Sequence, residues 1–264
     1  MKERKSISFY KAQAKEQLLG NYGMAIGAFA LVFVCSYFLH SILMGAFNAS
    51  TISGRIVTTE NIEEISNALA AGSVSVEITI NLIALVSGVF YSLLYTGYLY
   101  ILKEISDGRR PRLADVFYCF SNHPDKVIII SLCMGVLQII TGLPALILSY
   151  VSDFGITYNV DKLLAWLLLV LIGNIVYIYI SIIFAFSYLI YLDNREFTAL
   201  ECLGMSVRYM RGNKLRYLGM VLSLLGYYLL GIISFGIGML YAEAYQSMVT
   251  VNMYKDIREY EGRI

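Results

Sequence analysis

Long apolar runs, separated by short charged segments, dominate the chain. Four of them contain no Lys or Arg, and they span about 24–47, 78–102, 127–151 and 163–192. An α-helix rises about 1.5 Å per residue, so about 20 apolar residues cross the ~30 Å hydrocarbon core of a bilayer. A cation at the centre of such a helix would cost about 2.5–3.5 kcal/mol on insertion. The pattern therefore predicts an all-α fold, a polytopic membrane helix bundle.

A fifth apolar stretch, residues 217–254, contains Glu243 as its only charged residue. As one helix it would be roughly 57 Å long, nearly twice the hydrocarbon thickness. Small residues that favour a tight turn interrupt its middle: Ser234, Gly236 and Gly238. We therefore predict two more transmembrane helices, about 218–233 and 239–254, and six in all. Five transmembrane helices are the alternative.

The positive charges are sorted among the segments that separate these runs. Nearly all Lys and Arg lie before the first run, between the second and third, between the fourth and fifth, or at the C-terminal end. Only Arg55 and Lys162 lie in the two remaining gaps. Short basic loops stay on the cytoplasmic side of a membrane. We therefore expect a multi-pass plasma-membrane protein with both termini in the cytoplasm.

Composition narrows the functional classes. The chain is 58% hydrophobic with a net charge of only +1, which gives no electrostatic reason to expect a nucleic-acid partner. Its longest polar gap, about 48–76, is too short to bury a core, so residues 1–264 are expected to form a single integral membrane domain. No HExxH, GxSxG, Walker or dinucleotide motif occurs. We expect no catalytic residues, no metal site, no cofactor and no enzymatic activity.

Amphipathic segments precede several apolar runs. In the first, about 7–20, apolar residues recur at helical spacing beside Lys11 and Lys15. Residues 113–120 and 197–210 behave similarly. Such helices lie in the membrane interface with their cations near anionic headgroups. The predicted lipid contacts are Lys11, Lys15, Arg109, Arg110, Arg112, Arg208 and Arg211.

A threefold internal repeat is suggested by how these segments end. They end alike at Gly20-Asn21, Ser121-Asn122 and Gly212-Asn213, each directly before an apolar run. Gly and Asn end helices because they adopt the left-handed conformation at low cost. The even-numbered runs also end alike, at Lys103-Glu104-Ile105, Leu192-Asp193-Asn194 and Lys255-Asp256-Ile257. The repeat unit would be an interfacial helix, a turn and a membrane hairpin; the alternative is chance, because any helix beside a membrane needs a terminator.

Six segments of the chain match a family pattern: residues 14–23, 107–111, 199–213, 228–231, 235–238 and 252–254. In these segments the chain resembles one family of bacterial membrane proteins, the domain of unknown function 975. The family usually has a Pro-Tyr pair near the start of the last helix, where this chain has Tyr241-Ala242-Glu243-Ala244-Tyr245. The resemblance implies a multi-spanning bundle in the plasma membrane of Gram-positive bacteria. It implies no reaction, ligand or catalytic residue.

Glu243 is the most informative single residue, because it lies about five residues inside the sixth predicted helix. An ionisable group at that depth usually faces the bundle or a hydrated cavity. His40 should lie at comparable depth on the first helix, and we predict that the two residues pair. The alternative places Glu243 at headgroup level, in solvent. The predicted intramembrane polar site comprises Glu243, His40, Gln138, Asn174 and Tyr95.

Two functions fit these features. The first is a non-enzymatic role in organising the membrane. The chain would bind lipids, including anionic ones, or protein partners such as a second copy of itself. It is favoured by the basic interfacial segments and the lack of a reactive cluster. The second is a small secondary transporter or channel, favoured by the repeat and by a polar path through the bundle that includes Glu243.

Overall fold

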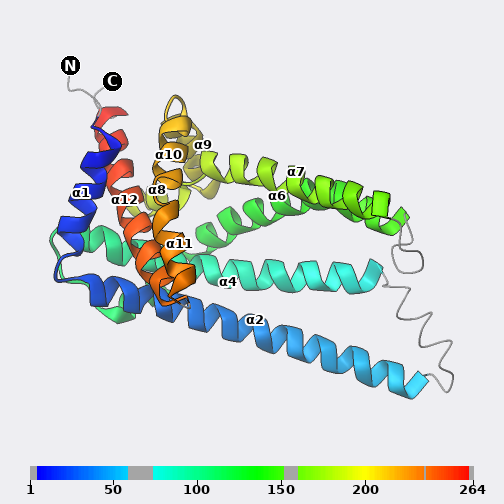
Figure 1. The fold of residues 1–264 in the computed structure, drawn as a ribbon. Coiled ribbons are helices and arrows are strands. Elements are labelled where there is room, and N and C mark those ends of the chain that lie inside the picture. The colour runs from blue at the N-terminus through cyan, green and yellow to red at the C-terminus, as the bar shows by residue number, and fades with distance from the viewer. Residues whose placement is uncertain (1–4, 59–73, 152–159, 235, 262–264) are drawn as a thin grey trace. The chain divides into compact units, whose positions relative to one another are not determined.

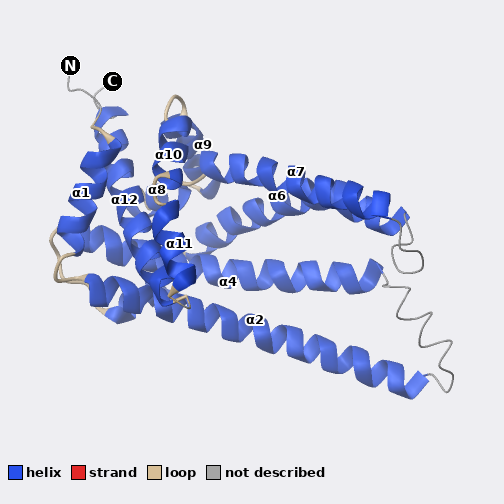
Figure 2. Cartoon of the chain, in the orientation of Figure 1, coloured by secondary structure: helices blue, strands red, loops and turns tan. Residues whose placement is uncertain are grey.

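All regular elements in the described part of the chain are helices (Figure 2). The computed structural model describes residues 5–58, 74–151, 160–234 and 236–261. The elements are α1 (Ile7–Leu18), α2 (Tyr22–Thr58), α4 (Val74–Ser106), the 3-10 helix η1 (Leu113–Phe117), α5 (Tyr118–Ser121), α6 (Pro124–Val151), α7 (Val160–Ile183), α8 (Ser187–Asp193), α9 (Ala199–Met210), α10 (Lys214–Leu222), α11 (Leu225–Ile233) and α12 (Ile237–Glu261). The predicted all-α fold class is confirmed.

Four helical segments are long and apolar enough to cross a membrane: Tyr22–Asn48, Ile78–Ser106, Pro124–Leu148 and Val160–Asp193. They coincide with the four apolar runs of the sequence. The membrane-helix character of the chain is thereby confirmed. The last of the four is interrupted by a short turn between α7 and α8.

The fifth apolar stretch forms three helices, where the sequence predicts two. α10 and α11 are separated by a break at residues 223–224, and α12 doubles back along α11 (Figure 1). Gly236 has a φ of 89°, a left-handed value that glycine adopts without strain. The predicted turn is therefore present, but α12 continues to Glu261. That these last helices complete six crossings stays a prediction.

The chain folds into two compact units that alternate along the sequence. That residues 1–264 form a single integral membrane domain stays a prediction. The first unit comprises Met1–Val34, Phe90–Ser131 and Ser181–Ile264, and the second comprises Cys35–Val89 and Leu132–Ile180. Helices α2, α4, α6 and α7 each contribute residues to both units.

The core of the first unit is built around α12, which packs against α11, α1 and α9 (Figure 1). Met248, Val249 and Met253 on α12 are fully buried. Asn252, a buried polar residue of this helix, has a partner: it donates from Nδ2 to Gln17 Oε1 at 2.9 Å. A buried polar side chain costs little once it is hydrogen-bonded, so α12 can be central although it is not strongly apolar.

A close contact anchors η1 on α4 in the same unit. A Cβ atom added to Gly97 would lie 1.9 Å from the carbonyl oxygen of Val116, so only glycine allows the two backbones to come this close. Next to it, the rings of Tyr100 and Tyr118 stack at a centroid distance of 4.1 Å. This contact holds the segment after α4 against the helix.

Helices α1 and α9 have matching boundaries. Each has 12 residues and a hydroxyl N-cap: the side chain of Ser6 accepts from Phe9 N, and that of Thr198 accepts from Glu201 N. Each is followed by a left-handed glycine, with φ of 83° at position 20 and 81° at position 212. The next residue in both cases is an Asn whose Nδ2 donates to the carbonyl oxygen four residues back, at 3.1 Å and 2.8 Å.

The second unit consists of exposed apolar helices. No described residue of α7 is buried, and Leu168, Leu171 and Ile175 are each more than half exposed. A Cβ on Gly173 would lie 2.5 Å from the carbonyl oxygen of Thr141, so α6 and α7 are in close contact there. An apolar surface of this extent is stable only in an apolar medium, as expected for helices that contact lipid tails.

Candidate functional site

Glu243, on α12, is held by hydroxyl groups of the first unit. Tyr228 on α11 donates from its hydroxyl to Oε2 at 2.7 Å, and Ser247 donates from Oγ to Oε1 at 3.2 Å. Tyr95 on α4 extends this chain of hydrogen bonds, because its hydroxyl lies 3.4 Å from Ser247 Oγ. No cationic side chain in the described residues pairs with this carboxylate. Ser247 thus connects Glu243 and Tyr95, two of the five residues of the predicted polar site.

Further tyrosines line α4 next to this chain. The ring of Tyr95 stacks on that of Tyr91 at 5.5 Å and contacts that of Tyr98 at 5.8 Å. The hydroxyl of Tyr98 is buried and has no hydrogen-bond partner among the described residues. Hydroxyl groups both donate and accept, so this cluster can stabilise either protonation state of Glu243.

The other three residues of the predicted polar site belong to the second unit. His40 Nδ1 lies 3.1 Å from Ser87 Oγ. Gln138 is exposed, and Asn174 is exposed and donates from Nδ2 to its own helix, to Val170 O at 2.8 Å. The predicted pairing of His40 with Glu243 stays a prediction.

Asp193, at the end of α8, is the centre of an ionic cluster that sequence reasoning missed. Its carboxylate pairs with Lys103 of α4 and with Arg258 of α12, and accepts from the hydroxyl of Tyr254 at 2.7 Å. The side chain of Asp193 is 6% exposed and that of Lys103 is 16% exposed. Both residues lie in the similar helix ends noted in the sequence: Lys103 in Lys103-Glu104-Ile105 and Asp193 in Leu192-Asp193-Asn194. Their spacing along the chain does not show that the two side chains form an ion pair.

A second polar cluster joins α12 to the end of α4. Lys255 donates from Nζ to Ser106 Oγ at 2.6 Å and to Asp107 Oδ1 at 2.5 Å. Asp107 also accepts from Arg109 at 2.8 Å. Burial alone would raise the pKa of Asp107, but the hydrogen bonds from Lys255 and Arg109 outweigh it and hold that pKa below its ordinary value.

The seven predicted lipid-contacting cations divide into two groups. Three of them have protein partners: Lys11 donates to Ser223 O, Arg109 pairs with Glu104 and Asp107, and Arg208 pairs with Glu261. The other four are exposed and have no ion pair or side-chain hydrogen bond within the described parts of the chain: Lys15, Arg110, Arg112 and Arg211. These four keep their charge available for a ligand.

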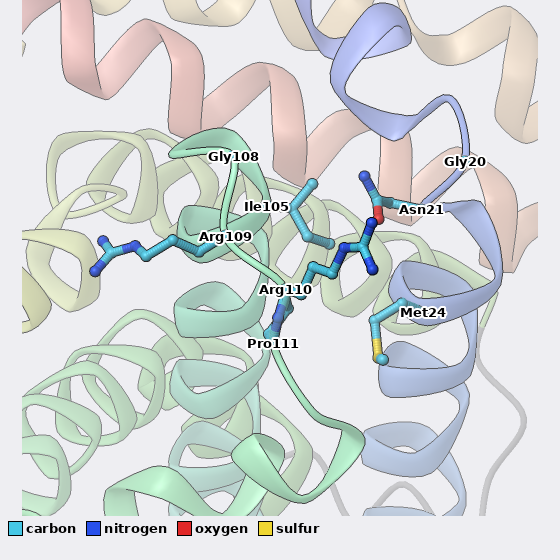
Figure 3. A pocket seen from close by; sticks show the side chains of 8 residues that line it. All are labelled: Gly20, Asn21, Met24, Ile105, Gly108, Arg109, Arg110 and Pro111. Carbon is cyan, nitrogen blue, oxygen red and sulfur yellow. The ribbon is translucent and has the colours of Figure 1, made fainter.

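One of the four, Arg110, lies on a pocket of about 570 Å³ in the first unit (Figure 3). The lining residues come from the turn between α1 and α2 with the first turn of α2, and from the end of α4 with the segment after it: Gly20, Asn21, Met24, Ile105, Gly108, Arg109, Arg110 and Pro111. Figure 3 shows the side chain of Arg110 reaching toward Asn21 and Met24, whereas that of Arg109 points away from them.

Comparison with known families identifies the chain. The profile of the family described as "Protein of unknown function (DUF975)" matches residues 1–261. The chain belongs to this family. The resemblance noted in the sequence is therefore confirmed, and the match includes the Glu243 cluster, the Asp193 cluster and the pocket. No curated protein and no solved structure matches the chain.

The family has no assigned reaction, and two of the four cysteine side chains of this chain are unreactive. The thiols of Cys119 and Cys202 are fully buried, and burial raises their pKa to about 12 and about 11. A thiol with so high a pKa is a poor nucleophile at neutral pH. Among the described residues, no group of three or more His, Cys, Asp or Glu side chains could hold a metal ion.

Proposed function

We propose that this chain is a non-enzymatic plasma-membrane protein that binds and organises anionic lipids at its basic, cytoplasmic end. The observation that carries the proposal is the unpaired state of Lys15, Arg110, Arg112 and Arg211, in a unit where Lys103, Arg109 and Arg258 form ion pairs. Each lies in a segment that precedes or follows a long apolar helix, at the level of headgroups if those helices cross the membrane. Cations there gain about 1 kcal/mol each from an anionic leaflet.

Lipid analysis of the purified chain tests this proposal. Lipids that copurify in mild detergent should be enriched in phosphatidylglycerol or cardiolipin over phosphatidylethanolamine, relative to the source membrane. Replacing Lys15, Arg112 and Arg211 by Gln should reduce this enrichment. Replacing Glu16, Glu196 and Glu259 by Gln is the control, because it changes exposed charges of the opposite sign. A lipid composition equal to that of the source membrane would contradict the proposal.

The orientation is part of the proposal, with both termini in the cytoplasm. It is supported by the sorting of charges and by the matching ends of α1 and α9, which fit two copies of an interfacial helix in a repeated unit. Buried Cys119 and Cys202 are poor reporters, so introduced cysteines are needed at exposed sites such as Val160 and Leu215, which are 66% and 84% exposed. A membrane-impermeant maleimide should label Val160→Cys on intact cells. It should label Leu215→Cys only after the membrane is opened, and the reverse pattern would refute the orientation.

Proton-coupled transport is the second candidate, and the hydroxyl-bound Glu243 favours it. A carboxylate without a cationic partner inside an apolar bundle is a natural proton carrier. Proteoliposomes loaded with a pH-sensitive dye and energised by a potassium diffusion potential should acidify faster than empty vesicles. Glu243→Gln should abolish the difference, whereas exposed Glu16→Gln should keep it. Equal rates for the wild type and empty vesicles would exclude proton conduction through the chain.

A further inference from the structure

Two neighbouring arginines of the basic segment after α4 have opposite electrostatic surroundings. The Arg109 guanidinium is within 3.0 Å of Glu104 and 2.8 Å of Asp107. Lys255 also pairs with Asp107, so these two acidic and two basic groups neutralise one another. Arg110 has no ion pair or hydrogen bond in the described parts of the chain, and its charge therefore sets the potential in the adjoining pocket.

Two arginines line the pocket, and Arg110 is the one without an acidic partner; apolar side chains form part of the wall. Met24, Ile105 and Pro111 supply the apolar surface, and Ile105 is almost completely buried. A volume of about 570 Å³ lies within the 300–1,000 Å³ of typical ligand sites. A ligand that suits both features has an anionic group for Arg110 and an uncharged, partly apolar part for the walls.

The position of the pocket favours a lipid as the source of that anion. It lies where the apolar segment Tyr22–Asn48 begins and the segment Ile78–Ser106 ends. If these helices cross the membrane, the pocket is at the depth of the headgroups. A guanidinium forms bidentate hydrogen bonds with phosphate oxygens. A zwitterionic headgroup also has a phosphate, but its positive group cancels the negative charge, so an anionic headgroup suits Arg110 better.

We propose that this pocket binds the phosphoglycerol headgroup of one anionic phospholipid, with Arg110 as the phosphate ligand. This inference rests on the proposed function and adds to it a defined site, a ligand class and one decisive residue. The Arg109 guanidinium positions the segment through Glu104 and Asp107 and does not bind the lipid. The two arginines therefore form a matched pair of variants with the same change in charge.

Native mass spectrometry of the full chain in detergent, titrated with phosphatidylglycerol, tests the assignment. Arg110→Gln should weaken binding of the first lipid by about 10-fold or more, because it removes the charge-assisted hydrogen bonds to the phosphate. Arg109→Gln should change the affinity for the first lipid by less than about 2-fold. Met24→Trp, which fills the pocket without changing any charge, should also weaken it, and thermal unfolding checks that each variant is folded.

The possible outcomes separate the site, the source of the anion and the proposed function. Equal losses in Arg109→Gln and Arg110→Gln, or full binding by Met24→Trp, would overturn the site. Displacement of the lipid by millimolar glycerol phosphate would show a soluble anion as the ligand and overturn the lipid assignment. If only the combined Lys15, Arg112 and Arg211 variant loses lipid, the pocket is wrong and the proposed function stands. If the wild type does not prefer phosphatidylglycerol to phosphatidylethanolamine, the proposed function itself fails.

Discussion

The two units of the chain place their apolar and polar side chains in opposite ways. The first unit buries large side chains such as Tyr10, Leu94 and Tyr254, together with hydrogen-bonded polar groups. In the described part of the second unit, Ser87 and Ala145 are the buried residues, while most Leu, Ile and Val side chains on α7 are exposed.

In this chain, high hydropathy does not mark the core. In the candidate membrane segment Val160–Asp193, the most apolar 18-residue window has a mean hydropathy of 2.6, and only 6% of that window is buried. The much more polar α12 is the most extensively packed helix of the first unit. In a membrane, apolar side chains face lipid at no cost, and polar side chains gain by facing one another. The following changes test that contrast.

The largest effect is expected at Asp193 in the first unit. Asp193→Asn leaves Lys103 and Arg258 without their counter-ion, and breaking a buried ion pair typically costs about 3–5 kcal/mol. The unfolding midpoint in detergent should fall sharply, whereas exposed Glu16→Gln should leave it within about 0.5 kcal/mol of the wild type. A midpoint for Asp193→Asn equal to that of the wild type would show that the cluster does not stabilise the fold.

The next effect concerns the exposed face of the second unit. Ile175 is 57% exposed near the centre of its apolar segment. Ile175→Lys should cost about 2.5–3.5 kcal/mol of membrane insertion, measured by the inserted fraction in microsomes. Leu200→Lys, at a 69% exposed site on α9, is the control and should insert normally. Equal insertion of the two variants would mean that the face around Ile175 does not contact lipid.

A smaller effect is expected at Gly97, where α4 meets η1. Any Cβ there overlaps the carbonyl oxygen of Val116, so Gly97→Ala should destabilise the first unit by about 1–3 kcal/mol. Gly88, on the same helix, has no atom within 4 Å of an added Cβ, so Gly88→Ala should be neutral or slightly stabilising. Thermal unfolding of both variants measures the difference, and similar midpoints would argue against the close contact.

The smallest effect is the pH dependence contributed by Asp107. Because its pKa is lowered in the folded state, its pairing stabilises the fold above the unfolded pKa of about 3.9 and is lost as pH falls through the lower folded value. The side chain is 34% exposed, so the contribution should be below about 1 kcal/mol. The midpoint difference between the wild type and Asp107→Asn should therefore shrink between pH 6 and pH 3. A difference that is the same at both pH values would contradict this role.

The sequence predicts the apolar segments well and the polar partners poorly. The four long segments are delimited by charges on both sides, and the turn near Gly236 follows from glycine's conformational freedom, so local information suffices for both. The pairing of Lys103 with Asp193 joins residues far apart in the chain and depends on packing that no local pattern encodes. Arg109 and Arg110 are the same residue type at adjacent positions, and only the structure distinguishes the paired one from the free one.

The single tryptophan of the chain gives the most direct test that the second unit lies in the membrane. Trp166 lies on α7, in the part of the second unit that should be surrounded by lipid tails. In vesicles, its fluorescence should be quenched by lipids brominated on their acyl chains and protected from iodide in the aqueous phase. Strong quenching by iodide, with none by brominated lipids, would place α7 in water and contradict the assignment of the second unit to the membrane.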